Sequence, residues 1–170
     1  MKKQILGLSA ALFAAGLCAA GPGGNGPAKD DQEIQALEER FVAAFQAKDV
    51  EAVMKSYAPG TELLVFDVVP PRQYVGFDAY KKGWQEFFAG FGPIHLVERS
   101  EFSVTTDGKL GYGHSIQRVL ATGKNGAMVE FTVRVTDCYR KIDGKWLITH
   151  EHVSVPVDLA TGKADLASKP

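Results

Sequence analysis

The sequence has few groups suited to redox or nucleophilic chemistry, and cysteine is the scarcest of them. Its 170 residues include two cysteines, Cys18 and Cys138. Cys18 falls in an N-terminal segment that we expect to be removed, so Cys138 remains as a single thiol and an internal disulfide is excluded. Strand alternation places Cys138 beside Thr136 and Arg140, away from any base that would activate it. We therefore interpret Cys138 as a structural residue.

The motifs of several cofactor and hydrolase families are missing too. The chain has no G-x-x-x-x-G-K-[ST], no G-x-G-x-x-G after a predicted strand and no G-x-S-x-G. These motifs carry phosphate-binding loops, dinucleotide sites and nucleophile elbows. The formal net charge is -1, so the composition does not indicate nucleic acid or an anionic membrane as a partner. The chemistry left open needs no cofactor.

The sequence also lacks a hydrophobic run long enough to remain in a membrane. Two lysines near the start precede an apolar run from Ile5 to Ala15, and the small residues Cys18-Ala19-Ala20 follow. This is the pattern of a secretory signal peptide, and the run is short for a spanning helix. We predict a signal peptide over residues 1–20 and an exported, periplasmic protein that begins near Gly21, with no membrane association after the signal is removed.

A lipid anchor at Cys18 is an alternative to plain cleavage. In that case the signal would be cut just before a cysteine that follows a small residue. Leu17 occupies the preceding position, so the residues favour simple export.

The mature chain is divided into a leader, one domain and a tail. Residues 21–30 are rich in Gly and Pro and are predicted to be flexible, residues 31–157 form the domain, and residues 158–170 form a C-terminal tail. Apolar residues at helical spacing predict helices over 30–48, from 49 to about 58, and over 77–90. Asp30-x-x-Glu33 predicts a capping box at the start of the first helix.

The remaining segments of the domain are predicted to be mainly β-strands. A strand is expected over 61–66, and the two prolines within 67–74 then interrupt regular structure. Turn signals at Asp107-Gly108, Asn125-Gly126 and Asp143-Gly144 divide residues 94–156 into four antiparallel strands. The predicted fold is α+β: a cone-shaped, curved antiparallel sheet wrapped around three N-terminal helices.

Counting back from these turns predicts which side chains meet. A two-residue turn at Asp143-Gly144 places Asp137 opposite His150 and Val135 opposite His152. A similar turn at Asn125-Gly126 places His114 opposite Asp137, with Arg118 on the same face. The expectation is that His114, Asp137 and His150 lie side by side in a pocket lined by aromatic and aliphatic groups.

The order of elements, together with the final R-K-I-D-G-K-W-L-I-T-H-E-H-V-S, resembles the nuclear transport factor two-like superfamily. Within it the chain is most similar to the SnoaL-like, ketosteroid isomerase-homologue branch, from about Asp31 to Val157. The same ending also resembles the association domain of calcium/calmodulin-dependent protein kinases, which is not an enzyme.

The resemblance implies a small-molecule pocket inside the sheet and a homodimer. Ketosteroid isomerases use a carboxylate base with hydroxyl donors, for which Asp67 or Asp137 and Tyr57 or Tyr74 are the candidates. Phenylalanine stands on the first helix where their tyrosine is expected, so the residues do not favour steroid isomerisation. The predicted catalytic residues are Asp137, His150, His114 and Asp67, and the predicted ligand-binding residues are Tyr57, Tyr74, Trp84, Arg118, Trp146 and His152.

Each of these assignments has an alternative. Asp137 and its histidines form either a catalytic pair or a structural polar pair, and Arg118 is either a partner of Asp137 or a clamp for an anionic ligand. His114, Asp137, His150 and His152 would also suit a metal ion, although the family resemblance favours no metal and no cofactor. The function that we expect is binding of a small, partly apolar molecule, with acid/base chemistry of the isomerase, cyclase or hydratase type; the alternative is a non-enzymatic binding or association module.

Overall fold

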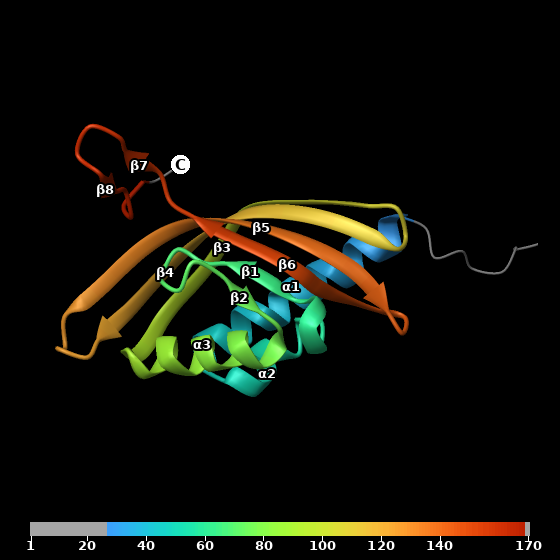
Figure 1. Ribbon diagram of the computed structural model, residues 1–170, viewed down its shortest axis with the longest axis horizontal. Coiled ribbons are helices and arrows are strands. Elements are labelled where there is room, and N and C mark those ends of the chain that lie inside the picture. Colours follow the sequence, from blue (N-terminus) through green and yellow to red (C-terminus); the bar gives the residue numbers. More distant parts are fainter. Residues whose placement is uncertain (1–26, 169–170) are drawn as a thin grey trace, which may run out of the picture.

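The computed structural model describes residues 27–168 and shows three helices packed against one face of a curved sheet (Figure 1). The predicted signal peptide and the Cys18 anchor lie outside the described residues. The elements, in chain order, are α1 (Pro27–Ala47), α2 (Val50–Met54), η1 (Gly60–Glu62), β1 (Leu64–Phe66), β2 (Tyr74–Val75), α3 (Phe77–Ala89), β3 (Phe91–Thr106), β4 (Leu110–Gly123), β5 (Met128–Ile142), β6 (Lys145–Ser154), β7 (Val157–Asp158) and β8 (Lys163–Ala164).

The main sheet has six strands in the order β2-β1-β6-β5-β4-β3. Strands β3 to β6 form the predicted antiparallel meander, and β1 joins β6 in parallel. The predicted α+β architecture with a curved sheet around three helices is therefore confirmed. In the predicted tail, β7 and β8 form a separate hairpin that projects from the body (Figure 1).

The helices follow their local signals, with one correction. Asp49 caps α2 as expected, because its Oδ1 accepts a hydrogen bond from the Ala52 backbone N at 3.0 Å. In contrast, α1 already begins at Pro27, ahead of the predicted boundary at residue 31 and inside the predicted flexible leader. Asp30 therefore lies within the helix, and the predicted capping box is wrong.

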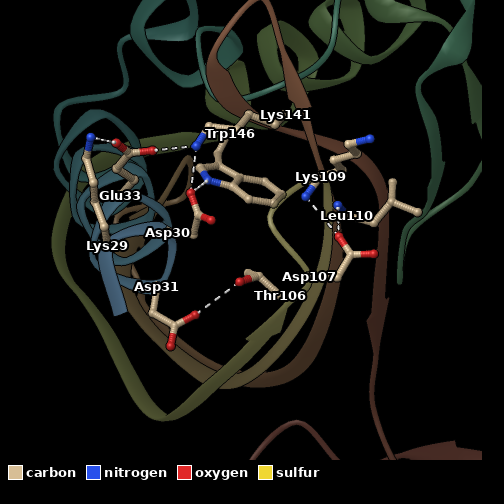
Figure 2. A network of polar contacts seen from close by, with 10 residues as sticks. All are labelled: Lys29, Asp30, Asp31, Glu33, Thr106, Asp107, Lys109, Leu110, Lys141 and Trp146. Atoms are coloured by element: carbon tan, nitrogen blue, oxygen red, sulfur yellow. Dashed lines mark hydrogen bonds and ion pairs between the residues drawn. The ribbon is translucent and has the colours of Figure 1, made fainter. Parts of the chain in front are cut away.

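Asp30 instead ties the start of α1 to the β5–β6 hairpin (Figure 2). Its carboxylate is 1% exposed, and Oδ1 accepts hydrogen bonds from Lys141 Nζ at 2.6 Å and from Trp146 Nε1 at 3.1 Å. The hydrogen bond from Lys141 lowers the pKa of Asp30 below its usual value. Lys141 also pairs with Glu33 at 3.4 Å. The hydrogen-bonded carboxylate thus joins segments more than a hundred residues apart in the sequence.

One of the two turns used to set the register forms as predicted. Asp143 and Gly144 both have positive φ, 48° and 77°, and Ile142 pairs with Lys145. The Asn125-Gly126 turn is wider, since the last pair before it is Thr122 with Met128 and an odd number of residues lies between them. An odd loop shifts the register by one residue, and this exchanges the faces of β4 relative to the prediction.

A second shift occurs in β6. Tyr139 pairs with Ile148, but Cys138 pairs with His150, so Thr149 is an extra residue in a β-bulge. Before the bulge, Trp146 and Ile148 point into the core as predicted; beyond it, the alternation is reversed. The inward positions become Glu151 and Val153 in place of His150 and His152.

Aromatic side chains fill the space between the helices and the inner face of the sheet. Phe41 and Phe45 of α1 pack edge-on against Trp84 of α3, with ring centroids 5.7 Å and 5.1 Å apart. Tyr57 packs in the same manner on Tyr80, at 5.1 Å. Such edge-to-face contacts add to the stabilisation from burying the rings. Most of these rings also line a pocket between the helices and the sheet.

Candidate functional site

An apolar pocket lies between the inner face of the sheet, α1 and α3, and we call it the inner pocket. Its empty volume is about 620 Å³, including the part that opens to solvent. Most of its walls are aromatic or aliphatic, and its polar side chains are few. Its lining consists of Phe41, Phe45, Asp67, Val68, Val69, Tyr80, Gly83, Trp84, Phe87, Gln117, Val119, Phe131, Val133, Val135, Glu151 and Val153.

Glu151 is the most unusual group in this wall. The bulge at Thr149 turns its side chain inward, where the residue is 4% exposed. Its Oε2 accepts a hydrogen bond from Tyr57 Oη at 2.7 Å, and its Oε1 accepts one from Tyr80 Oη at 2.5 Å. Burial raises the pKa of Glu151 to about 7, although both tyrosine hydrogen bonds act in the opposite direction. At neutral pH this carboxyl group can therefore both take up and release a proton.

A second carboxylate, Asp67, lines the same pocket at the point where the chain leaves β1. Its Oδ1 accepts a hydrogen bond from the Val68 backbone N at 2.6 Å, which orients the side chain. Burial raises the pKa of Asp67 above its usual value. The negative charge of Asp67 also contributes to the raised pKa of Glu151. The charge of Asp67 thus makes Glu151 harder to ionise.

Two further carboxyl groups lie buried next to Glu151. Asp137 is its direct partner across β5 and β6, and burial raises the pKa of Asp137 well above its usual value, with further contributions from the charges of Glu38 and Glu151. Glu38 of α1 accepts a hydrogen bond from Tyr139 Oη at 2.8 Å, and burial raises its pKa as well. These acids therefore keep their protons to a higher pH than exposed carboxyl groups.

The predicted pairing of Asp137 with histidine is wrong. Asp137 faces Gly113 and Glu151, whereas His114 pairs with Thr136 and His150 pairs with Cys138 on the outer face of the sheet. His150 Nδ1 contacts the Leu64 carbonyl oxygen at 2.8 Å. The set that was considered for a metal ion is thus divided between two faces. Among residues 27–168, no three histidine, cysteine or acidic side chains are placed to hold a metal ion.

The predicted ligand-binding residues are divided in the same way. Trp84 lines the inner pocket, and Tyr57 donates a hydrogen bond to Glu151 in its wall. Tyr74 packs beside Tyr80, with ring centroids 5.3 Å apart. Trp146 is held by Asp30 and lies away from the inner pocket, which corrects its assignment.

Arg118 and His152 are corrected for the same reason, since both lie on the outer face. Arg118 Nε pairs with Glu130 at 2.7 Å, and Arg118 Nη1 pairs with Glu98 at 3.4 Å. His152 is exposed across from Thr136. Conversely, Val153 lines the inner pocket, because the side chains of β6 exchange faces beyond the bulge.

Sequence reasoning missed Glu151, Tyr80 and Glu38. Only Glu38 had a local signal: it follows Ile34 by four residues and precedes Phe41 by three, so it is a charged residue on the apolar face of α1. Tyr80 was one of several aromatic residues in its helix. The inward position of Glu151 depends on a bulge, for which the strand pattern has no marker.

Comparison with known families matches residues 34–158 to the SnoaL-like domain. The chain belongs to the SnoaL-like domain family. This confirms the resemblance based on its element order and C-terminal strand. A search of curated proteins found no match to this SnoaL-like chain.

Solved structures agree with the family assignment. An NTF2-like protein of unknown function from Pseudomonas putida KT2440 is 28% identical, with a TM-score of 0.75, over 85% of this chain and 100% of that chain. An NTF2-like superfamily protein from Salmonella enterica serovar Typhimurium is 17% identical, with a TM-score of 0.71, over 80% and 97%. A protein with a cystatin-like fold from Nostoc punctiforme is 20% identical, with a TM-score of 0.62, over 78% and 95%. The latter two matches support the fold alone.

In the part of the SnoaL-like chain that the structure describes, no helix combines the length and apolar character needed to cross a membrane.

Proposed function

We propose that this SnoaL-like domain binds a small, largely apolar molecule in the inner pocket and catalyses proton transfer on it, with Glu151 as the acid/base group. The observation that carries the proposal is the placement of Glu151, a carboxyl group in an apolar wall that is held by two tyrosine hydroxyls and has a pKa of about 7. A general base is most effective when its pKa lies near the working pH.

The chemistry that suits this site is removal of a proton from carbon next to a carbonyl group. The C–H bond breaks, the proton forms an O–H bond with Glu151, and the electron pair moves to the carbonyl oxygen as an enolate. Returning the proton to another atom completes an isomerisation. In a dehydration, the electron pair of the enolate forms a C=C bond while the hydroxyl group on the next carbon takes the proton from Glu151 and leaves as water. Asp67, which lines the same pocket, is placed to assist as a second proton carrier.

The polar groups behind the pocket support this role. Tyr57 and Tyr80 hold both oxygens of Glu151, so the carboxylate is oriented before a ligand arrives. Asp137 lies directly across the strands from Glu151, and burial together with the charges of Glu38 and Glu151 raises the pKa of Asp137, which disfavours a second negative charge beside Glu151. Few competing water molecules are expected against walls that are mainly aromatic and aliphatic.

Hydrogen-deuterium exchange on a simple ketone tests the proposal. With 2-tetralone in D₂O, the wild-type protein should accelerate exchange of the protons next to the carbonyl group, as followed by proton NMR. Glu151→Gln should lower the rate by a factor of about 100 or more. Glu101→Gln changes an exposed glutamate in the β3 strand and serves as the matched control.

The expected pH profile gives a second criterion. The rate should rise with pH up to about 7, as Glu151 becomes ionised, and then level off. Equal rates in the wild type and Glu151→Gln would exclude Glu151 as the base. Binding of 2-tetralone without any accelerated exchange would favour the alternative of a non-enzymatic binding module.

A further inference from the structure

Gln117 is a polar side chain of the inner pocket that has no partner within the protein. It lies on β4, is 5% exposed, and forms part of the pocket wall. Among residues 27–168 the side-chain amide of Gln117 makes no hydrogen bond. Its oxygen and nitrogen both remain in contact with open space. A buried amide without a hydrogen bond is costly. The free amide of Gln117 therefore faces the space that a ligand would occupy.

Trp84 shows a related feature on the helical side of the pocket. Its indole Nε1 is buried and, within the described residues, also lacks a hydrogen-bond acceptor. The ring itself is held by Phe41, Phe45 and Phe88, with centroid distances of 5.7, 5.1 and 5.2 Å. Because Nε1 of Trp84 is sealed from open space, Gln117 is the one of these two N–H donors that a ligand in the pocket can reach.

The strand register shows how far Gln117 lies from Glu151. Gln117 pairs with Val133 and Glu151 pairs with Asp137, so the two are separated by four residues along β5 and by two strand spacings across it. On a sheet this corresponds to roughly 13 Å along the strands and about 10 Å across. Val133 and Val135, which line the pocket, lie between these two positions. At this separation the two side chains contact different parts of an elongated molecule in the pocket.

We propose that the inner pocket selects an elongated apolar molecule with oxygen at both ends, and that Gln117 recognises the end remote from Glu151. This inference rests on the proposed function, because it assigns the reacting carbonyl end to Glu151. The remote group would be a hydroxyl or carbonyl oxygen, which the amide can bind as a donor and, for a hydroxyl, also as an acceptor. The apolar strip between the two ends, which includes Val133 and Val135, suits the hydrocarbon body of such a molecule.

A pair of ketones that differ in one oxygen tests the proposal. The probes are 2-tetralone and 6-hydroxy-2-tetralone, in which the hydroxyl lies on the second ring, away from the ketone. Calorimetric titration should show the hydroxylated probe binding the wild type about ten times more tightly, since an otherwise unpartnered amide gains a hydrogen bond. Gln117→Leu should abolish this preference, so that the two ketones bind with similar affinity.

Kinetics separate recognition from catalysis. In the exchange assay, Gln117→Leu should raise the half-saturating concentration of 6-hydroxy-2-tetralone about tenfold while the maximal rate stays within about twofold of wild type. Gln85→Leu removes an exposed amide from α3 and is the matched control. Gln117→Leu should melt no lower than wild type, because the change removes an unpartnered polar group from an apolar wall.

The possible outcomes distinguish this inference from the proposed function. Retained preference for the hydroxylated probe in Gln117→Leu, or no preference in the wild type, would overturn the inference while exchange through Glu151 could still stand. A Gln117-dependent preference without accelerated exchange would support recognition and overturn the catalytic proposal. If neither ketone binds the wild type, the inference is overturned as well.

Discussion

Replacing Glu151 by Gln should stabilise the protein at alkaline pH, although it should slow proton transfer by a factor of about 100 or more. The carboxyl group has an ordinary pKa of 4.5, and burial raises the pKa to about 7 in the folded protein. Between these values the unfolded chain releases the proton while the folded protein keeps it. The folded state then binds more protons, so the free energy of unfolding falls as the pH rises from about 4.5 to about 7 and is constant above that range.

The magnitude follows from the same two values. A difference of about 2.5 pKa units corresponds to about 3 kcal/mol at 1.36 kcal/mol per unit. Glutamine keeps the size of the side chain and removes this penalty, so Glu151→Gln should be more stable than wild type by up to about 3 kcal/mol at about pH 8. Near pH 4.5 the two proteins should have nearly equal stability.

Neighbouring ionisable groups determine how much of the pH dependence of stability remains in Glu151→Gln. Asp137 and Glu38 also have raised pKa values, so part of the decline in stability with rising pH should persist in Glu151→Gln. Removal of the Glu151 charge should reduce this part too, because that charge raises the pKa of Asp137. The ionisable groups that face Glu151 are Tyr57 after α2, Tyr80 of α3, Asp67 after β1, Glu38 of α1 and Asp137 of β5.

Urea unfolding followed by circular dichroism at several pH values measures the effect. The slope of stability against pH in the wild type, and its reduction in Glu151→Gln, are the quantities to compare. Glu101→Gln should follow the wild-type curve, because its side chain is exposed. A wild-type stability that does not decline between about pH 4.5 and 7, or a variant that is no more stable at pH 8, would refute the reasoning about burial.

Four further predictions concern other parts of the molecule. Tyr80→Phe removes a hydrogen bond that lowers the pKa of Glu151, so carboxyl-carbon NMR titration should show that pKa rising by about one unit. Asp30→Asn should lower the melting temperature by about 5 °C at neutral pH; because Lys141 lowers the pKa of Asp30, the contribution of Asp30 is present above its ordinary pKa of 3.8, and the difference between the two proteins should shrink below that pH. Light scattering should show a homodimer, since no helix of residues 27–168 covers the outer face of the sheet (Figure 1); a monomer at micromolar concentration would contradict this. Intact mass of the protein from its native envelope should show a start near Gly21, and retention of residues 1–20 would contradict export.

Local signals predicted the elements of this SnoaL-like domain well. Apolar spacing located α1 and α3, Asp49 marked the start of α2, and Asp143-Gly144 marked the tightest turn of the meander. Each of these depends on neighbours within a few residues, which the sequence displays directly. Asp30 shows the limit of such signals, since its partners Lys141 and Trp146 are distant in the chain.

The candidate site was predicted in part, and the errors have one physical origin. Asp67 and Trp84 line the inner pocket, and Tyr57 contacts its carboxylate, as the resemblance implied for a ligand site near these positions. The predicted catalytic histidines were misplaced because two shifts of one residue, at the loop before Met128 and at the bulge of Thr149, exchange the faces of β4 and of the end of β6. Side chains of a strand alternate between its two faces, so a shift of one residue is sufficient to move each side chain to the opposite face.

The sequence by itself determined the order of elements, the α+β class and the family, because these depend on local spacing and on a long C-terminal motif. Only the tertiary structure decided which acid faces the pocket. The segment His150-Glu151-His152 offers three titratable side chains in a row, and alternation allows the middle one or the outer two to point inward. The extra residue in β6 selects Glu151, and burial beside Tyr57 and Tyr80 then makes it a carboxyl group with a pKa of about 7.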